Sequence, residues 1–524
     1  MNREDMIAPL KYNLMNEVEK NQGEEGKIAI LWENEQGEKK QITYSDLIKG
    51  SNKVGNVFLG EGLQKGDTVL VIIPRLIEAY QVYLGALKAG IVVIPSSEML
   101  KAKDLQYRIN HGNVKAIVCY KDFVSEINAV PEASQLAKFS VGGSVEGWYN
   151  LEDKMGQASD ELETADTTRD DMAFLAYTSG TTGNPKGVVH THGWAYAHLK
   201  TAPEHWLGIA DNDIVWATAA PGWQKWIWSP FLSVLGTGVT GFVYNGKFEP
   251  NKYLSLLDEY KVNVLCCTPT EYRIMAKVDN LSDYKLKELH SAVSAGEPLN
   301  KEVIDTFRRE FNIDVRDGYG QTENTLLLGV TKGMELKPGS MGKPTPGNIV
   351  EIVDDEGIPC EEGIVGDIAV HVDSPALFKE YLNDPERTAK QFRGNYYITG
   401  DRAKKDEDGY FWFEGRSDDI IISSGYTIGP FEVEDALVKH ASVKECAVVA
   451  WPDEVRGHIV KAFVVLKDGI DSNDPQLIPN LQQHVKDLTA PYKYPRAIEF
   501  IEELPKTTSG KIRRIELRQQ TIKQ

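Results

Sequence analysis

One stretch of the sequence combines glycine, hydroxyl and lysine side chains in a pattern that suits a phosphate group. It runs from residue 177 to residue 187, directly after the apolar run 172–176, which predicts the end of a β-strand. Glycines let the backbone fold tightly and turn its N–H groups inward, while hydroxyls and an ammonium group add donors. The residues expected to hold phosphate are Thr178, Ser179, Gly180, Thr181, Thr182, Gly183 and Lys186. The Walker pattern cannot be laid on this loop, so the residues predict a phosphate-binding loop of another type.

A second group of charges lies near the C-terminus. Seven basic side chains fall between residues 486 and 514 of a chain whose net charge is −19. They are Lys486, Lys493, Arg496, Lys506, Lys511, Arg513 and Arg514. A solvated surface and a site for a polyanionic ligand are both consistent with such a cluster.

The elements that must position these residues can be predicted from hydrophobic periodicity. Apolar, β-branched runs at 69–73, 91–94 and 116–119 predict buried strands, and 76–89 predicts a helix between two of them. Such an alternation is typical of parallel strands joined by crossover helices. We therefore predict an α/β fold whose large N-terminal domain contains parallel-rich sheets.

The pattern changes after about residue 345. Short strands are expected at 348–353, 366–371 and 410–413, separated by Asp-Gly-type turns, and they predict a β subdomain. From residue 432 the order helix, strand, strand, helix, strand predicts a small α+β domain.

Composition excludes several classes of protein. An excess of acidic residues argues against a nucleic-acid partner. Five scattered cysteines predict neither a disulfide framework nor a zinc site, and they favour a reducing compartment. The N-terminus does not read as a secretory signal, and no apolar run approaches the ~18–20 residues of a membrane span. We expect a cytoplasmic protein without a membrane span.

Beyond the glycine-rich loop, five further motifs in order resemble those of the acyl-adenylate-forming superfamily. They are 319–323, 399–401, 415–416, 424–426 and 505–511. The stretches 451–461 and 490–496 look most like the medium-chain acyl-CoA synthetase branch. This resemblance implies an ATP-dependent acid:CoA ligase, in which a carboxylate and ATP give acyl-AMP and pyrophosphate, and acyl-AMP and coenzyme A then give acyl-CoA and AMP. It implies ATP, Mg²⁺ and coenzyme A as cofactors.

The resemblance also assigns the nucleotide site and the domains. Lys511, Thr322 and Glu323 are the implied catalytic residues, with Glu323 on the metal. The remaining implied ATP contacts are Gly296, Glu297, Pro298, Gly318, Tyr319, Gly320, Gln321, Asp401 and Arg416. Asp418 falls at the family's hinge, which divides the chain into residues 1–417, for ATP and acyl binding, and a mobile domain at 418–524.

A coenzyme A site and an acyl pocket are implied in the same way. The CoA contacts are Ser424, Gly425, Tyr426, Arg456, Lys486, Tyr494 and Arg496. The branch usually has arginine where this chain has Thr427, which puts one phosphate contact in doubt. Trp223 and Gly320 are expected to line the acyl pocket, because acetate-specific relatives carry tryptophan at the position of Gly320. We therefore expect a short-to-medium or branched fatty acid, with an aryl acid as the alternative.

Other readings remain. An amino-acid-activating domain needs an acid to hold the substrate amine, and 219–223 contains none. A luciferase-like enzyme shares every ATP motif, whereas a non-catalytic nucleotide-binding module would not need both Lys511 and Glu323. The resemblance also makes Lys511 a target for a lysine acetyltransferase. The sequence leaves the oligomeric state undetermined.

Overall fold

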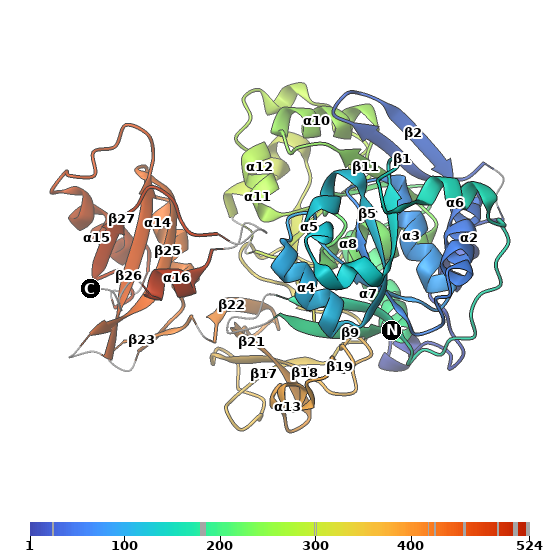
Figure 1. Ribbon diagram of the computed structural model, residues 1–524. Coiled ribbons are helices and arrows are strands. Elements are labelled where there is room, and N and C mark those ends of the chain that lie inside the picture. The colour runs from blue at the N-terminus through green and yellow to red at the C-terminus, as the bar shows by residue number, and fades with distance from the viewer. Residues whose placement is uncertain are drawn as a thin grey trace. The chain divides into compact units, whose positions relative to one another are not determined.

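The computed structural model describes residues 1–23, 26–178, 185–297, 299, 301–417, 419–423, 426–453, 457–489, 492–506 and 512–519. Figure 1 labels its elements. Within these ranges every helix is too short or too polar to span a lipid bilayer.

Two compact units make up the chain. The first contains Met1–Val350 and His371–Phe392, and the second contains Glu351–Val370 and Arg393–Gln524. This division by compactness falls before the hinge expected from the sequence, so the boundary between residues 417 and 418 stays a prediction.

The first sheet of unit 1 has eight strands and carries the glycine-rich loop. In spatial order they are β19 (Glu380–Tyr381), β9 (Lys186–Thr191), β8 (Met172–Thr178), β4 (Val92–Pro95), β3 (Thr68–Ile72), β5 (Val114–Tyr120), β6 (Ala137–Val141) and β7 (Tyr149–Asn150). Strands β3 to β8 are parallel to their neighbours among these strands. Strand β9 runs antiparallel to β8, and β19 runs antiparallel to β9. The strands and the helix α3 (Ile77–Lys88) expected from the apolar runs are confirmed.

A nine-stranded sheet forms the other half of unit 1. In spatial order its strands are β16 (Lys343–Pro344), β15 (Leu326–Gly329), β14 (Val315–Gly320), β13 (Ser291–Ala295), β12 (Val264–Cys267), β10 (Ile214–Ala217), β11 (Thr240–Asn245), β1 (Ile28–Asn34) and β2 (Lys39–Thr43). From β1 to β14 neighbouring strands are parallel. The carboxyl ends of β13 and β14 therefore share one sheet edge, where ligands of open α/β sheets bind.

Helices pack on both sheets of this unit. They are α1 (Met15–Glu19), α2 (Tyr44–Gly60), α3, α4 (Ala102–His111), α5 (Val124–Asn128), α6 (Leu151–Gln157), α7 (His192–Thr201), α8 (Gln224–Trp226), α9 (Val234–Thr237), α10 (Pro250–Glu259), α11 (Pro269–Met275), α12 (Lys301–Phe311) and α13 (Pro385–Lys390). Two π-helical turns, η4 (Ala202–Leu207) and η5 (Ile227–Ser233), interrupt this regular pattern. Turns of this type are rare and are frequent at functional sites.

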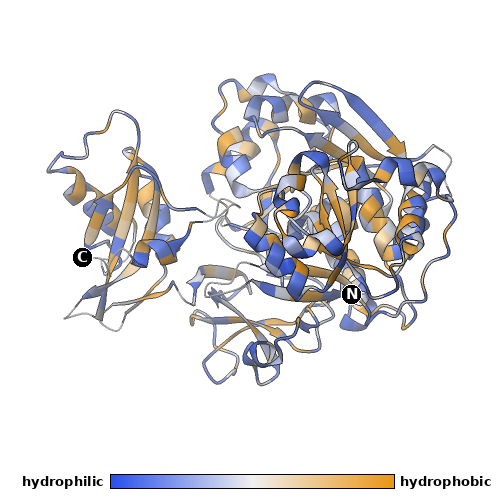
Figure 2. Ribbon diagram, viewed as in Figure 1, coloured by the Kyte–Doolittle hydropathy of each residue, from blue (hydrophilic) through white to orange (hydrophobic). Residues whose placement is uncertain are grey.

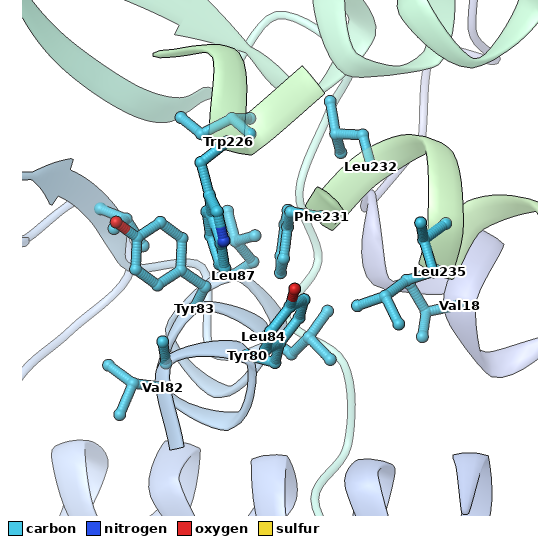
Figure 3. Close-up of a cluster of buried hydrophobic side chains, with 14 of the residues drawn as sticks. Val18, Tyr80, Val82, Tyr83, Leu84, Leu87, Trp226, Phe231, Leu232 and Leu235 are labelled. Atoms are coloured by element: carbon cyan, nitrogen blue, oxygen red, sulfur yellow. The ribbon is translucent and has the colours of Figure 1, made fainter. Parts of the chain in front are cut away.

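The main core joins α3 to the α8–η5 segment (Figure 3). Trp226 lies 4.8 Å from Tyr83 and 5.2 Å from Phe231, measured between ring centroids, and all three rings are buried. Hydrophobic residues concentrate on the inner strands and the inward helix faces, while the outer faces are hydrophilic (Figure 2). Burial of these aromatic groups fixes α8 against α3.

Unit 2 begins with a five-stranded sheet made of β17 (Val350–Val353), β18 (Gly366–His371), β20 (Phe392–Arg393), β21 (Tyr396–Lys405) and β22 (Phe411–Arg416). The elements that follow are β23 (Ile421–Ser423), β24 (Tyr426–Ile428), α14 (Pro430–Val438), β25 (Val443–Asp453), β26 (Gly457–Leu466), α15 (Leu477–Leu488), β27 (Ala497–Phe500) and α16 (Arg514–Gln519). The expected β strands and the later helix, strand, strand, helix, strand order are confirmed.

Candidate functional site

A buried carboxylate brings two distant sequence motifs together in unit 1. The Tyr381 hydroxyl donates to Oε1 of Glu323 over 2.8 Å. The Nζ atom of Lys186 lies 3.8 Å from the same oxygen and 4.9 Å from the centre of the Tyr381 ring. The glycine-rich loop and the 319–323 motif therefore meet at one charged cluster.

Both ends of the glycine-rich loop are held by α4. The Tyr107 hydroxyl donates to the carbonyl oxygen of Pro185 over 3.0 Å, and Nδ1 of His111 lies 2.9 Å from the Tyr177 hydroxyl. Thr178 and Lys186 face each other across the β8–β9 ladder. Strands β8 and β9 on either side of the loop therefore pair with each other, and the residues at their facing ends contact one neighbouring helix.

The carboxyl end of β14 carries three of the predicted ATP contacts, Gly318, Tyr319 and Gly320. A Cβ added at Gly318 would lie 2.6 Å from the Trp206 indole, so only glycine fits this contact. The pairing of β14 with β15 shifts register between Tyr319 and Gly320, as at a β-bulge. Beyond it, the amide N–H of Gln321 donates to Asn324 Oδ1 over 2.7 Å. The turn therefore places residues 319–322 at the carboxyl ends of the strands, where open α/β sheets bind their ligands.

Asp317 is a candidate that the sequence reasoning missed. Its Oδ1 atom accepts from the amide N–H of Gly318 over 2.9 Å, and burial raises the pKa of its carboxyl to about 7. An acid directly before the Gly-Tyr-Gly run was the available signal.

The predicted partner segment on β13 is described only in part. Gly296 has a φ of +107°, which glycine adopts readily, and a Cβ there would meet nothing within 4 Å. The Glu297 carboxylate accepts from Thr270 over 2.9 Å and from Arg273 over 3.2 Å. The side chain of Glu297 is thus engaged by α11.

The segment 221–228, which contains the expected pocket residue Trp223, holds three tryptophans in different environments. Trp223 is half-buried at the start of α8, after Gly222, whose φ is +92° and whose Cα lies against the Ser96 backbone. Trp226 belongs to the core described above. Trp228 lies 7% exposed in η5. Trp223 is thus the partly accessible member of the three.

Gly320, which is predicted to line the acyl pocket, lies close to two neighbouring groups. A Cβ at Gly320 would lie 2.3 Å from the Thr325 carbonyl oxygen and 3.0 Å from the Trp228 ring. His198 fixes this region, because its Nε2 atom lies 2.8 Å from the Trp228 carbonyl oxygen and its Nδ1 atom contacts the Thr325 hydroxyl. Gly320 therefore accommodates the Thr325 carbonyl first and the tip of the Trp228 indole second, and a side chain at this position would collide with both.

In unit 2, two of the predicted ATP contacts are cross-strand neighbours. Asp401 pairs with Arg416 in the β21–β22 ladder, and Oδ1 of Asp401 lies 3.9 Å from Nε of Arg416. Asp401 is buried, whereas the Arg416 side chain is 48% exposed. An acceptor and a donor for two adjacent hydroxyls thus lie side by side.

Three predicted CoA contacts also meet in unit 2. Lys486 Nζ lies 4.1 Å and the Arg496 guanidinium carbon 4.7 Å from the centre of the Tyr494 ring, and Arg496 donates to the Tyr494 hydroxyl over 2.7 Å. Tyr426 and Thr427 lie in β24. The aromatic ring holds two cations close together, in a cluster suited to phosphate.

The other predicted site residues lie outside the described ranges. They are Ser179, Gly180, Thr181, Thr182, Gly183, Pro298, Asp418, Ser424, Gly425, Arg456 and Lys511. The described neighbours of Lys511 are well anchored. The Arg513 amide N–H donates to the Pro505 carbonyl oxygen over 2.8 Å, and Arg514 donates to both oxygens of buried Glu434 over 2.8 Å.

Comparison with known proteins gives a consistent result. A family model described as AMP-binding enzyme matches residues 18–382, and one described as the AMP-binding enzyme C-terminal domain matches 432–511. The uncharacterized acyl-CoA ligase YtcI of Bacillus subtilis is 63% identical over 518 residues, which cover 99% of this chain and 98% of that protein. The mitochondrial acyl-coenzyme A synthetase ACSM3 of Mus musculus is 44% identical over 94% of this chain and 86% of its own length.

Solved structures agree with the fold. The anthranilate CoA ligase AuaEII, in complex with anthranoyl-AMP, superposes with a TM-score of 0.91 at 29% identity, and the match covers 100% of this chain and 99% of that one.

The Glu323 cluster makes a first prediction. Tyr381→Phe removes the hydroxyl that donates to the Glu323 carboxylate. A hydrogen bond to a charged group of this kind is worth about 1.5–3 kcal/mol. We expect the affinity for ATP with Mg²⁺ to fall about tenfold or more by calorimetric titration. Tyr284→Phe, which removes a surface hydroxyl bonded to Asn251, serves as the matched control. Equal affinities in both variants would contradict the role of the cluster.

Asp317 makes a second prediction, on pH. The pKa of Asp317 is raised to about 7 in the folded protein, so this carboxyl ionises at a lower pH in the unfolded chain than in the folded one. The folded state therefore loses stability as the pH rises from the ordinary aspartate range to about 7. Asp317→Asn should therefore raise the thermal midpoint more at pH 8 than at pH 5, by about 2–4 °C for each kcal/mol recovered. Asp211→Asn, at an exposed site, is the control. A gain independent of pH would show that the carboxyl does not titrate as assigned.

Proposed function

The chain belongs to the AMP-binding enzyme family, and from this premise we propose that it is an AMP-forming acid:CoA ligase. It joins a carboxylic acid to coenzyme A in two steps. The carboxylate first reacts with ATP to give acyl-AMP and pyrophosphate, and the thiol of coenzyme A then displaces AMP to give acyl-CoA. The family matches over nearly the whole chain support this reaction.

The observation that carries the proposal is the approach of Lys186 to Glu323. A site for ATP must offer cations to phosphate and oxygen ligands to the metal that accompanies it. Lys186 supplies an ammonium group at the glycine-rich loop, and Glu323 supplies a buried carboxylate 3.8 Å away. Tyr381 holds that carboxylate in place. These residues fit Mg²⁺, which when bound would neutralise charge on the phosphate oxygens.

The first step brings together two anions. A carboxylate oxygen forms a bond to the α-phosphorus, and the bond from that phosphorus to the pyrophosphate oxygen breaks, so negative charge grows on the phosphoryl oxygens. A positive side chain is needed there to offset the repulsion. By sequence position this residue is Lys511, and Asp401 with Arg416 would hold the ribose. Thr322, next to Glu323, would add a hydroxyl donor.

The second step uses coenzyme A, whose phosphates need cations. Lys486 and Arg496 flank one tyrosine ring and supply two positive charges close together. They do so without a base at position 427, where the branch usually has arginine. The sulfur attacks the acyl carbon, and the bond between that carbon and the AMP oxygen breaks. A swing of the C-terminal domain about Asp418 would exchange Lys511 for the CoA turn at 424–426.

A short-to-medium or branched fatty acid is the proposed substrate. An aryl acid is the alternative, and the similarity to the anthranilate CoA ligase AuaEII supports it by analogy. The Trp228 ring lies next to Gly320, and the half-buried Trp223 is proposed as a second wall of the pocket. A planar ring and a branched chain both suit an aromatic wall. A bulky indole against Gly320 limits length. We also propose a cytoplasmic location, because the five scattered cysteines favour a reducing compartment.

Release of pyrophosphate with a panel of acids, with and without coenzyme A, tests the proposed function. An acid:CoA ligase should need CoA for thioester formation and for sustained turnover. Thioester formation from a fatty or aryl acid is the expected result. Turnover with amino acids, or oxidation with light emission, would favour the competing adenylating classes, and no turnover with any acid would favour a binding module.

The catalytic lysine gives a third prediction. Lys511→Ala should slow adenylation by about 10²–10³-fold, because one charge that stabilises the phosphoryl transition state is lost. Thioester formation from supplied acyl-AMP should be unchanged. Lys506→Ala, which loses only a partly exposed ion pair with Glu445, is the control. Equal losses in both half-reactions would refute the role. Acetylation of Lys511 by a lysine acetyltransferase would act in the same way, because it removes the charge.

The indole at Gly320 gives a fourth prediction. Trp228→Ala should shift kcat/KM towards longer acids, since each methylene buried in the new space is worth about 0.8 kcal/mol, or about fourfold. Trp228→Phe should shift it less. The control is Trp148→Phe, in a separate core cluster. If all three variants keep the wild-type chain-length profile, Trp228 does not limit the pocket.

A further inference from the structure

A cavity of about 370 Å³ lies on the opposite edge of the nine-stranded sheet from the candidate site. It is lined at the amino ends of β13 and β14, by Ser291 and by residues 313, 314 and 316. The same two strands carry Gly296 and the 318–320 run at or just beyond their carboxyl ends. The cavity is thus separate from the nucleotide motifs, and its volume falls in the range of small-molecule sites.

The central feature of this cavity is a buried guanidinium. Arg316 is 8% exposed, and its terminal nitrogens donate to the Val330 carbonyl oxygen over 2.9 Å and to the Ser291 hydroxyl over 2.6 Å. Both acceptors are neutral. Among the described acidic residues none forms an ion pair with Arg316. A buried cation without an anionic partner is destabilising, and guanidinium has five donors, so further acceptors can still be bound.

Other cations surround the same space. Lys332 and Arg308 also line it, and both are exposed. Lys332 forms no ion pair in the described part of the chain, whereas Arg308 binds Asp314, the one acid that lines the cavity, over 2.6 Å. His290 lies 3.0 Å from Asp213. Three permanent cations against one lining acid leave an excess of positive charge, in a chain whose total is −19.

We propose that this cavity binds a small metabolite bearing a phosphate-type oxyanion. The planar guanidinium of Arg316 matches two oxygens of such a group, and Lys332 supplies a mobile second charge at the rim. The Ser291 hydroxyl positions Arg316, because it accepts from the guanidinium while it donates to the Leu207 carbonyl oxygen over 2.6 Å. The remaining volume exceeds what one oxyanion fills, which favours a phosphorylated organic molecule over free phosphate. This site is independent of the acid:CoA ligase reaction, and its test does not depend on that reaction.

Calorimetric titration with inorganic phosphate and with glycerol 3-phosphate tests the proposal. The titrations use protein without nucleotide, because ATP itself carries phosphate groups, and chloride holds the ionic strength constant. Comparison of the variants separates this cavity from the nucleotide site. Lys332→Glu reverses the charge at an exposed position and should weaken binding at least tenfold. Lys277→Glu, at an exposed lysine on another part of unit 1, should bind like the wild type. Arg316→Gln should abolish binding, and adenylation in Lys332→Glu should remain at the wild-type rate.

Each result decides the matter. Tighter binding of glycerol 3-phosphate than of phosphate, lost in Lys332→Glu and kept in Lys277→Glu, supports an organic phosphate site. Equal affinities with the same dependence on Lys332 support a site for free phosphate. Absence of binding to the wild type, or equal affinities in Lys332→Glu and Lys277→Glu, overturns the proposal even if Arg316→Gln does not fold.

Discussion

The contact of Tyr381 and Lys186 with Glu323 is the constraint on which unit 1 depends. Lys186 begins β9 of the eight-stranded sheet, Glu323 follows β14 of the nine-stranded sheet, and Tyr381 ends β19. A buried carboxylate is stable only when donors and cations reach it. Satisfying Glu323 therefore brings the edges of two sheets to one point. The amide N–H of Phe378 adds to this, because it donates to the Glu323 carbonyl oxygen over 2.7 Å.

A comparable ion network organises unit 2. Glu434 on α14 accepts two bonds from Arg514, which also lies 3.7 Å from Asp419, and Asp419 binds Arg518 over 2.8 Å. Removing one member of such a buried network leaves an uncompensated charge, which costs roughly 3–5 kcal/mol. The network thus fixes α16, which begins three residues after Lys511, against the segment that follows Asp418. The predicted hinge and the predicted catalytic lysine are therefore adjacent in sequence to the same set of ion pairs.

Much of the fold followed from local patterns, whereas the site contacts did not. Strands β3, β4 and β5 were predictable because a buried parallel strand is a continuous apolar run. Tyr381 was missed because nothing in its neighbourhood marks it, and its partner Glu323 is 58 residues away. Trp228 was missed for a related reason, since its ring reaches Gly320 from η5. Asp317 differs, because an acid directly before the Gly-Tyr-Gly run was visible in the sequence.

The net charge of −19 raises the question of how this chain attracts anions. Long-range attraction cannot be the answer, because charges farther apart than about 8–10 Å are screened at ordinary ionic strength. The structure instead concentrates cations at short range, with Lys186 near Glu323, Lys486 and Arg496 around one ring, and Arg316 in its cavity. In each place an aromatic ring or burial restricts the cation, so less freedom is lost when an anion binds. Local preorganisation therefore determines anion binding, while the acidic surface elsewhere discourages polyanions such as nucleic acids.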